Sequence, residues 1–124
     1  FNTISVVDMS NMFCGCFKLN VLKLDNFDTS NVENMSHMFQ DCVRLTSLDL
    51  SSFDTSKVTN TEEMFFGCSI LETIYIGDGW NTDAVISSRD MFKSCTSLNG
   101  YSDTNTNDVT NANAETGYLT RKVA

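Results

Sequence analysis

A sequence repeat of 26 residues runs along this 124-residue chain. The period of this repeat restricts the possible folds more than any other feature of the sequence. The pair Met-Phe occurs at 12–13, 38–39, 64–65 and 91–92, in steps of 26, 26 and 27 residues. Other positions keep the same steps: Cys16, Cys42, Cys68 and Cys95; Leu19, Leu45, Leu71 and Leu98; Val32, Val58 and Val85. Such self-similarity is typical of repeat architectures, in which each unit buries its apolar face against its neighbours. We therefore expect a stack of similar units.

The register of the repeat also predicts how the chain is organised. Phe1 and Met9 take the positions of Phe27 and Met35, so the chain begins within the pattern, and we expect a monomeric fragment of a longer protein with repeats or a leader upstream. After Leu98 the pattern gives way to a polar stretch that ends in GYLTRKVA. The predicted division is a leucine-rich-repeat domain at 1–100 and a C-terminal cap and tail at 101–124. The predicted units start near Phe1, Phe27, Phe53 and Trp80.

Each unit reads as a strand, a corner and a short helix. LTSLDL at 45–50 has the L-x-x-L-x-L pattern of leucine-rich repeats, and its alternation predicts a strand. FDTS at 53–56 suits a corner, because its Asp and Ser side chains can bind nearby backbone groups. Thr59 and Glu62 are spaced as a capping box before Met64, which favours a short helix ending near Gly67. The predicted fold is an α/β solenoid of about three and a half coils, each a short parallel strand, a corner and a short helix, with a C-terminal cap.

One unit is longer than the others by a single residue. The extra residue lies between Ile76 and Trp80, where GDG replaces two residues of the neighbouring units. Because glycine adopts conformations that other residues avoid, Gly77 and Gly79 are expected to form the inserted turn.

The charge balance excludes several classes of partner. Asp and Glu exceed Lys and Arg by eight, and an acidic surface repels phosphate backbones and anionic lipids. No run of 18 apolar residues could span a bilayer, and the N-terminus lacks the charged and apolar regions of a signal peptide. We expect no nucleic-acid partner and no direct insertion into a membrane.

The string MFQDCVRLTSLDLSSFDTSKVTN at 38–60 resembles the repeat of the BspA-like leucine-rich-repeat surface proteins of bacteria. Their units read like MF-x-x-C-x-x-L-x-x-L-D-L-S-x-F-D-T-S-x-V-x-N-M. The resemblance covers residues 1–100 as repeats and 101–120 as a terminal cap, with departures at Trp80, Asn81 and Ser88. It implies a secreted or surface-anchored protein used for adhesion or host interaction, with no catalytic residues.

The cysteines admit three interpretations. A metal cage is disfavoured because four cysteines at one per unit form a line that cannot converge on one ion. Disulfides between neighbouring units would suit a secreted protein, but parallel side chains rarely meet the required dihedral angle. The third interpretation, which we favour for Cys42 and Cys68, is that of buried free thiols, with Cys14 outside the row and exposed.

Other candidate sites have simpler explanations. Asp25, Asp28 and Asp54 could attract Ca²⁺, but a recurring corner Asp more often binds local backbone groups. His37 lies near Ser36 and Asp41, yet nothing marks Ser36 as a nucleophile. We therefore predict no catalytic residue, no metal site and no cofactor, and a protein that is not an enzyme.

Binding is the remaining class of function. The residues expected to point outward from the strands form the candidate protein-binding face: Val21, Lys23, Asp25, Ser47, Asp49, Ser51, Thr73 and Tyr75. A charged and aromatic row there could hold a protein or a host surface ligand. The predicted function is a bacterial cell-surface or secreted binding module for adhesion or host-protein interaction. The alternative that stays open is a structural spacer or stalk within a larger surface protein.

Overall fold

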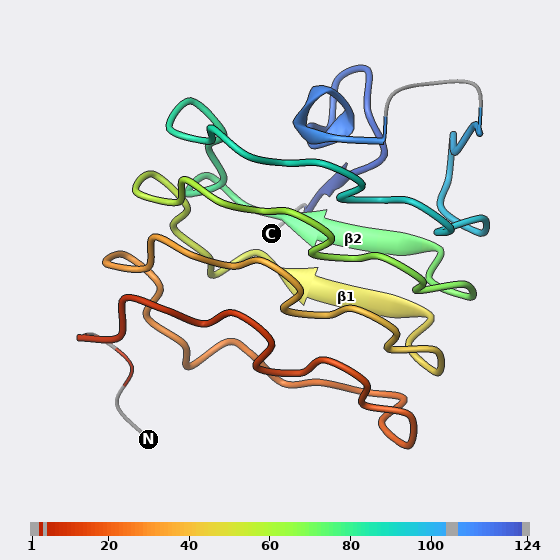
Figure 1. The fold of residues 1–124 in the computed structure, drawn as a ribbon, viewed down its shortest axis with the longest axis horizontal. Helices are drawn as coiled ribbons and strands as arrows, with labels where there is room; N and C mark the ends of the chain where they lie inside the picture. Colours follow the sequence, from red (N-terminus) through yellow and green to blue (C-terminus); the bar gives the residue numbers. More distant parts are fainter. Residues whose placement is uncertain (1–2, 4, 104–106, 123–124) are drawn as a thin grey trace.

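The sequence repeats lie side by side in the computed structural model, which describes residues 3, 5–103 and 107–122 (Figure 1). Three short strands form one parallel sheet in the order β1-β2-β3: β1 is Ser47–Leu50, β2 is Thr73–Ile76 and β3 is Thr120–Arg121. A 3-10 helix, η1, spans Val109–Asn111. Isolated parallel bridges join Asp8 to Asn34, Asn34 to Asn60 and Asn60 to Ser87. Phe1 lies outside the described residues.

The predicted fold class is wrong. The described residues form a three-stranded parallel sheet that does not close, and their only helix is η1, which lies in the C-terminal segment. The α/β solenoid with about three and a half coils and a short helix in each coil is therefore not what the sequence forms. β1 and β2 are parallel, as predicted. Residues 21–25, where a strand is also predicted, form none.

Tight turns replace the predicted helix because its N–H groups are divided between two sets of partners. Met38 donates to the Met35 carbonyl, three residues back, at 3.3 Å, whereas Phe39 donates to Met64 in the next repeat at 2.8 Å. His37 and Asp41 have φ angles of 58° and 59°, a left-handed conformation that an α-helix cannot contain. The same conformation recurs at Asn11, Glu63, Asp90, Gly15, Gly67 and Ser94.

The predicted capping box at Thr59 is also wrong. The Thr59 hydroxyl donates to the Glu33 carbonyl at 3.2 Å, and the Glu62 N–H donates to Oδ1 of Asn60 at 2.9 Å. Asn34 binds the Ser36 N–H in the same way. Asn34 and Asn60 thus each make a local turn with their side chain, as Asp8 does with the Ser10 N–H, and these turns compete with helix formation.

Stacked phenylalanines form the centre of the core. The rings of Phe13, Phe39, Phe65 and Phe92 lie nearly parallel, with centroids 5.6, 5.6 and 5.4 Å apart. Tyr118 meets Phe92 edge to face at 5.3 Å and closes this stack. The core residues Met38, Met64, Leu45 and Leu71 are fully buried around it. Equivalent residues therefore pack on one another, as the repeat predicts.

The threonine of each FDTS corner joins two repeats. Oγ1 of Thr29 donates to the Asp54 carbonyl at 3.0 Å and accepts the Asp54 N–H at 2.9 Å. Thr3 binds Asp28, and Thr55 binds Asn81, in the same two-way manner. These corner threonines are buried, so their hydroxyls satisfy backbone groups that water does not reach.

The glycines of the longer unit have a different role from the predicted one. A Cβ atom at Gly77 would lie 2.3 Å from the Ser51 carbonyl oxygen, and one at Gly79 would lie 2.6 Å from the Phe53 carbonyl oxygen. Neither glycine has a positive φ angle. Close approach of two backbones, rather than an unusual turn, requires glycine here.

Candidate protein-binding face

β1 and β2 bring four of the predicted face residues together. Leu48, Leu50, Ile74 and Ile76 are buried, and the residues that alternate with them point away from the core. The strand register pairs Ser47 with Thr73 and Asp49 with Tyr75. The sheet thus carries a carboxylate beside a half-buried aromatic ring.

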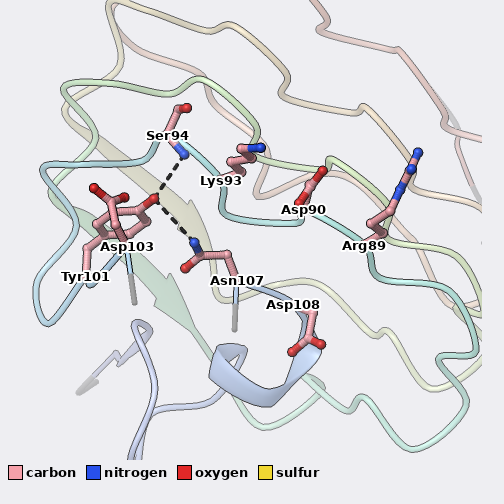
Figure 2. Close-up of a pocket in the computed structure, with 8 residues that line it drawn as sticks. All are labelled: Arg89, Asp90, Lys93, Ser94, Tyr101, Asp103, Asn107 and Asp108. Carbon is pink, nitrogen blue, oxygen red and sulfur yellow. Dashed lines mark hydrogen bonds between the residues drawn. The ribbon is translucent and has the colours of Figure 1, made fainter. Parts of the chain in front are cut away.

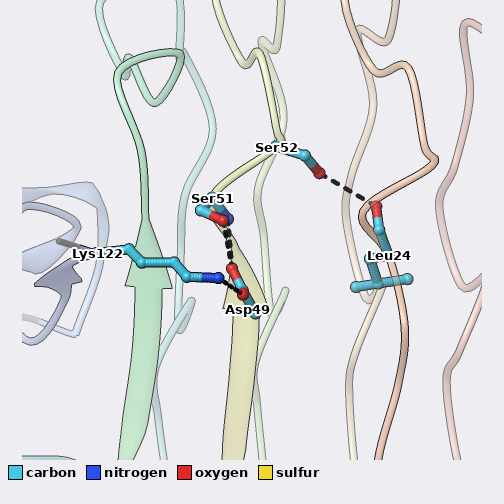
Figure 3. Close-up of polar contacts among 5 residues, drawn as sticks. All are labelled: Leu24, Asp49, Ser51, Ser52 and Lys122. Atoms are coloured by element: carbon cyan, nitrogen blue, oxygen red, sulfur yellow. Dashed lines mark hydrogen bonds and ion pairs between the residues drawn. The ribbon is translucent and has the colours of Figure 1, made fainter. Parts of the chain in front are cut away.

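The remaining face residues lie beside β1 without joining the sheet. Lys23 and Asp25 line a pocket of about 260 Å³ together with Asp49 and Lys122. The Ser52 hydroxyl donates to the Leu24 carbonyl at 3.1 Å and links this segment to the chain after β1 (Figure 3). Val21 is 64 % exposed. The segment 21–25 therefore borders the face as a loop, not as the predicted strand.

Asp49 is held on the face by three contacts. Its Oδ1 accepts bonds from the N–H and the hydroxyl of Ser51 at 2.9 and 2.5 Å. Its Oδ2 lies 2.6 Å from Nζ of Lys122, whose side chain reaches across β2 (Figure 3). Lys122 and then Ser51 lower the pKa of Asp49 to about 2, because both stabilise the ionised carboxylate. The carboxylate is therefore charged and half-exposed at neutral pH.

Lys122 is a face residue that sequence reasoning missed. It follows β3, and its N–H donates to the Ile76 carbonyl at 2.9 Å, which carries the tail along the edge of β2. Arg121 lies 3.3 Å from Asp78 on the same edge. No repeat covers residues 101–122, so the sequence contains no register that could place Lys122 beside Asp49.

A second pocket, of about 540 Å³, lies at the end of the last repeat (Figure 2). The Tyr101 hydroxyl accepts bonds from the Ser94 N–H at 3.1 Å and the Asn107 side-chain amide at 3.3 Å. Burial, followed by the nearby Asp103 carboxylate, raises the pKa of Tyr101. The lining mixes both signs of charge: Arg89, Lys93, Asp90, Asp103 and Asp108.

The cysteines behave as the third interpretation predicts. Cys42 and Cys68 are buried free thiols whose Sγ atoms donate to the carbonyls of Phe13 at 3.1 Å and Phe39 at 3.0 Å. Burial raises the pKa of Cys42 to about 12. Contact with Cys95 and burial raise the pKa of Cys68. Cys14 is free and exposed. These thiols fill the core instead of bridging repeats.

The corner aspartates are occupied by their own loops. Oδ1 of Asp28 accepts bonds from the N–H and hydroxyl of Ser30 at 3.0 and 2.5 Å, and Asp54 binds Ser56 in the same way. His37 contacts Gln40 at 2.6 Å. Within residues 3, 5–103 and 107–122, no three His, Cys, Asp or Glu side chains gather as metal ligands do.

The fold and the face define a chain of stacked sequence repeats with a short parallel sheet and a charged, half-exposed surface. Residues 1–104 match the family described as "Mycoplasma protein of unknown function, DUF285". The chain therefore belongs to the DUF285 family. Comparison with curated proteins and comparison with solved structures each gave no match. No helix in the described part of the chain is long and apolar enough to cross a membrane.

Proposed function

We propose that this protein is a binding module of the bacterial surface, which holds a protein ligand on the candidate protein-binding face. The observation that carries this proposal is the Asp49–Tyr75 pair, a charged and an aromatic side chain on adjacent strands with Lys23 and Lys122 beside it. Tyrosine, together with tryptophan and arginine, is among the side chains that most often dominate protein binding. The resemblance to BspA-like surface proteins supports adhesion as the role, and membership in the DUF285 family is compatible with a surface location.

The face is suited to a partner of mixed charge. Lys23 and Lys122 lie within one pocket with Asp25 and Asp49, so both signs of charge meet within a short distance. The partner must therefore satisfy both signs, which gives specificity more than raw affinity. The core beneath is rigidly filled, because Leu48, Leu50, Ile74 and Ile76 are at most 2 % exposed. A preorganised surface of this kind loses little conformational entropy on binding.

The test is a comparison of face variants in adhesion to host cells and to immobilised host surface proteins. The triple variant Lys23→Ala, Asp49→Asn, Tyr75→Ala removes one charge of each sign and the ring, and leaves Asp25 and Lys122. Asparagine at 49 keeps the acceptor for the Ser51 N–H, as Asn34 and Asn60 do in their own turns. We expect binding to weaken by about tenfold or more.

The control changes a lysine, an aspartate and a large apolar residue outside the sheet: Lys57→Ala, Asp83→Asn and Ile86→Ala. These three residues are exposed. We expect the control to bind as the unchanged protein does. If the face variant binds as well as the unchanged protein, the face is not the binding site. If neither protein adheres, the role of a structural spacer is favoured.

A further inference from the structure

The last repeat forms a tight turn where the two repeats before it begin a strand. β1 and β2 each start two residues after a repeat leucine, Leu45 and Leu71. Two residues after the equivalent Leu98 stands Gly100, whose φ angle is 83°. The Tyr101 N–H donates to the Leu98 carbonyl at 3.0 Å and closes the turn. Glycine suits this position because it adopts the left-handed conformation without strain.

The asparagine of this turn has an exposed side chain that is not hydrogen-bonded. The N–H of Asn99 donates to the Glu72 carbonyl at 3.3 Å, which holds its backbone beside the preceding repeat. Its side-chain amide makes no hydrogen bond with any residue that the structure describes. Other asparagines differ, because their Oδ1 atoms accept bonds from backbone N–H groups: Asn34, Asn60, Asn81 and Asn113. The Asn99 amide is therefore accessible and unrestrained.

The backbone nitrogen that follows Asn99 is also accessible. The N–H of Gly100 donates no hydrogen bond within the described part of the chain, and the residue is exposed. Since glycine has no Cβ atom, nothing on this residue shields its nitrogen from the Asn99 side chain. The sequence contains no other Asn-Gly pair. An unbonded side-chain amide and an unbonded backbone nitrogen thus stand next to each other here alone.

We propose that Asn99 is a site of spontaneous deamidation. The Gly100 nitrogen attacks Cγ of Asn99 and gives up its proton, while the bond between Cγ and Nδ2 breaks and ammonia leaves with that proton. The product is a cyclic succinimide. Water then opens the ring at either of its carbonyls, which gives aspartate or isoaspartate at position 99. The reaction consumes only water, and it needs no oxidant and no enzyme.

Isoaspartate at this position changes how the C-terminal segment is attached to the last repeat. It routes the backbone through the side chain of residue 99, so it inserts a carbon between the buried Leu98 and Tyr101. The Tyr101 hydroxyl accepts bonds from the Ser94 N–H at 3.1 Å and from the Asn107 side-chain amide at 3.3 Å (Figure 2). Both bonds depend on the turn that places Tyr101. The modification therefore loosens this end of the stack.

The test incubates the folded full chain in neutral buffer made with heavy-oxygen water and follows each asparagine by peptide mass spectrometry. The internal control is Asn20, which is exposed and occupies the position of Asn99 in the first repeat. Val21 follows it, and because its branched side chain hinders the nitrogen, Asn99 should lose its amide about tenfold faster or more. Aspartate and isoaspartate should both form at position 99, and both should carry heavy oxygen.

Two variants separate the chemistry from its effect on the fold. A Cβ atom at Gly100 would have no neighbour closer than 3.9 Å, so Gly100→Ala has room, and it should slow the loss of the Asn99 amide about tenfold. Freshly prepared Asn99→Asp carries the new charge without the longer backbone and should keep the melting temperature Tm, whereas the isoaspartate form should melt about 3 °C lower or more.

The proposal is overturned if Asn99 in the folded chain reacts no faster than Asn20. It is also overturned if Asn99 reacts only after the chain is unfolded in urea, because the turn would then protect the amide. An unchanged Tm in the isoaspartate form would contradict the loosening of the C-terminal segment.

Discussion

Oγ1 of Thr55 binds the backbone of Asn81 twice, donating to its carbonyl at 2.7 Å and accepting its N–H at 2.6 Å. We expect Thr55→Val to lower the free energy of unfolding by about 1–3 kcal/mol, because valine keeps the shape but leaves both backbone groups unpaired. Urea denaturation measures the change.

Thr61→Val is the matched control for Thr55→Val, and we do not expect it to lower the free energy of unfolding. Its Oγ1 is buried and has no hydrogen-bond partner within the described residues. Thr61→Val should therefore leave the free energy of unfolding unchanged or raise it by about 1 kcal/mol. Equal losses at both positions would contradict the role assigned to the corner threonines.

The phenylalanine stack should dominate stability. Phe65 is fully buried between Phe39 and Phe92. Phe65→Ala should cost about 3–5 kcal/mol of unfolding free energy, since it removes a large buried ring and leaves a cavity in the middle of the stack. Phe17→Ala, at a residue that is 61 % exposed, should cost under about 1 kcal/mol by the same denaturation measurement. Similar losses at both sites would refute a continuous stack.

Substitutions at Gly15 and Gly67 distinguish the cost of backbone strain from the cost of a steric clash. Gly15 and Gly67 have φ angles of 71° and 77°, but a Cβ atom at Gly67 would lie 2.2 Å from Oδ1 of Asp41, whereas at Gly15 the nearest atom is 3.6 Å away. Gly15→Ala should cost about 1–2 kcal/mol from the left-handed conformation alone. Gly67→Ala should cost more than Gly15→Ala, because it adds the clash with Asp41. In the Gly67→Ala variant, a further Asp41→Ser substitution should remove only this additional cost. Thermal denaturation of the three variants tests this order.

The pair of Asp49 and Lys122 should give a measurable pH dependence. Because the pKa of Asp49 is lowered to about 2, its ionised form stabilises the fold above the ordinary pKa of about 3.9, and this contribution is lost as pH falls from 4 to 2. Lys122→Met should move the pKa of Asp49 back toward its ordinary value, with the Ser51 bonds retaining part of the shift. NMR titration of the Asp49 side chain measures both values. An unchanged pKa in the variant would show that Lys122 does not contact Asp49 in solution.

Thiol reactivity should divide the cysteines. Cys42 and Cys68 are buried and their pKa values are raised, so few thiolates exist at neutral pH and reagent cannot reach them. Cys14 is exposed and should react with a disulfide reagent in native buffer. Burial, then the nearby Asp41, raises its pKa too, so its rate should increase with pH. Fast labelling of Cys42 would contradict the buried row.

The sequence predicts the stacking of equivalent residues between repeats better than it predicts secondary structure. The 26-residue period places Phe39 beneath Phe65 and Cys42 beneath Cys68, because equivalent residues of neighbouring repeats must meet. The same apolar spacing, at Met35, Met38 and Phe39, also imitates a helix. What decides against the helix is the division of N–H groups between the same repeat and the next one, and a pattern of side chains does not report it.

The sequence predicts only part of the candidate face, for a similar reason. Alternation in LTSLDL places Asp49 outward, and β1 does so in the structure. The equivalent stretch at 21–25 has the same alternation but forms no strand, since backbone bonds join β1 to β2 and not to residues 21–24. Lys122 comes from the segment without repeats, whose position depends on pairing between β2 and β3.

Photo-crosslinking from the face tests the central claim, that the sheet holds a protein ligand, most directly. Benzoylphenylalanine would replace Tyr75 on β2 in one variant and Ile86, which is 84 % exposed and outside the strands, in the other. After illumination on host cells, position 75 should form one defined protein adduct that excess unlabelled protein suppresses. Position 86 should form none. An adduct at 86 with none at 75, or the same adducts from both, would contradict binding through the sheet.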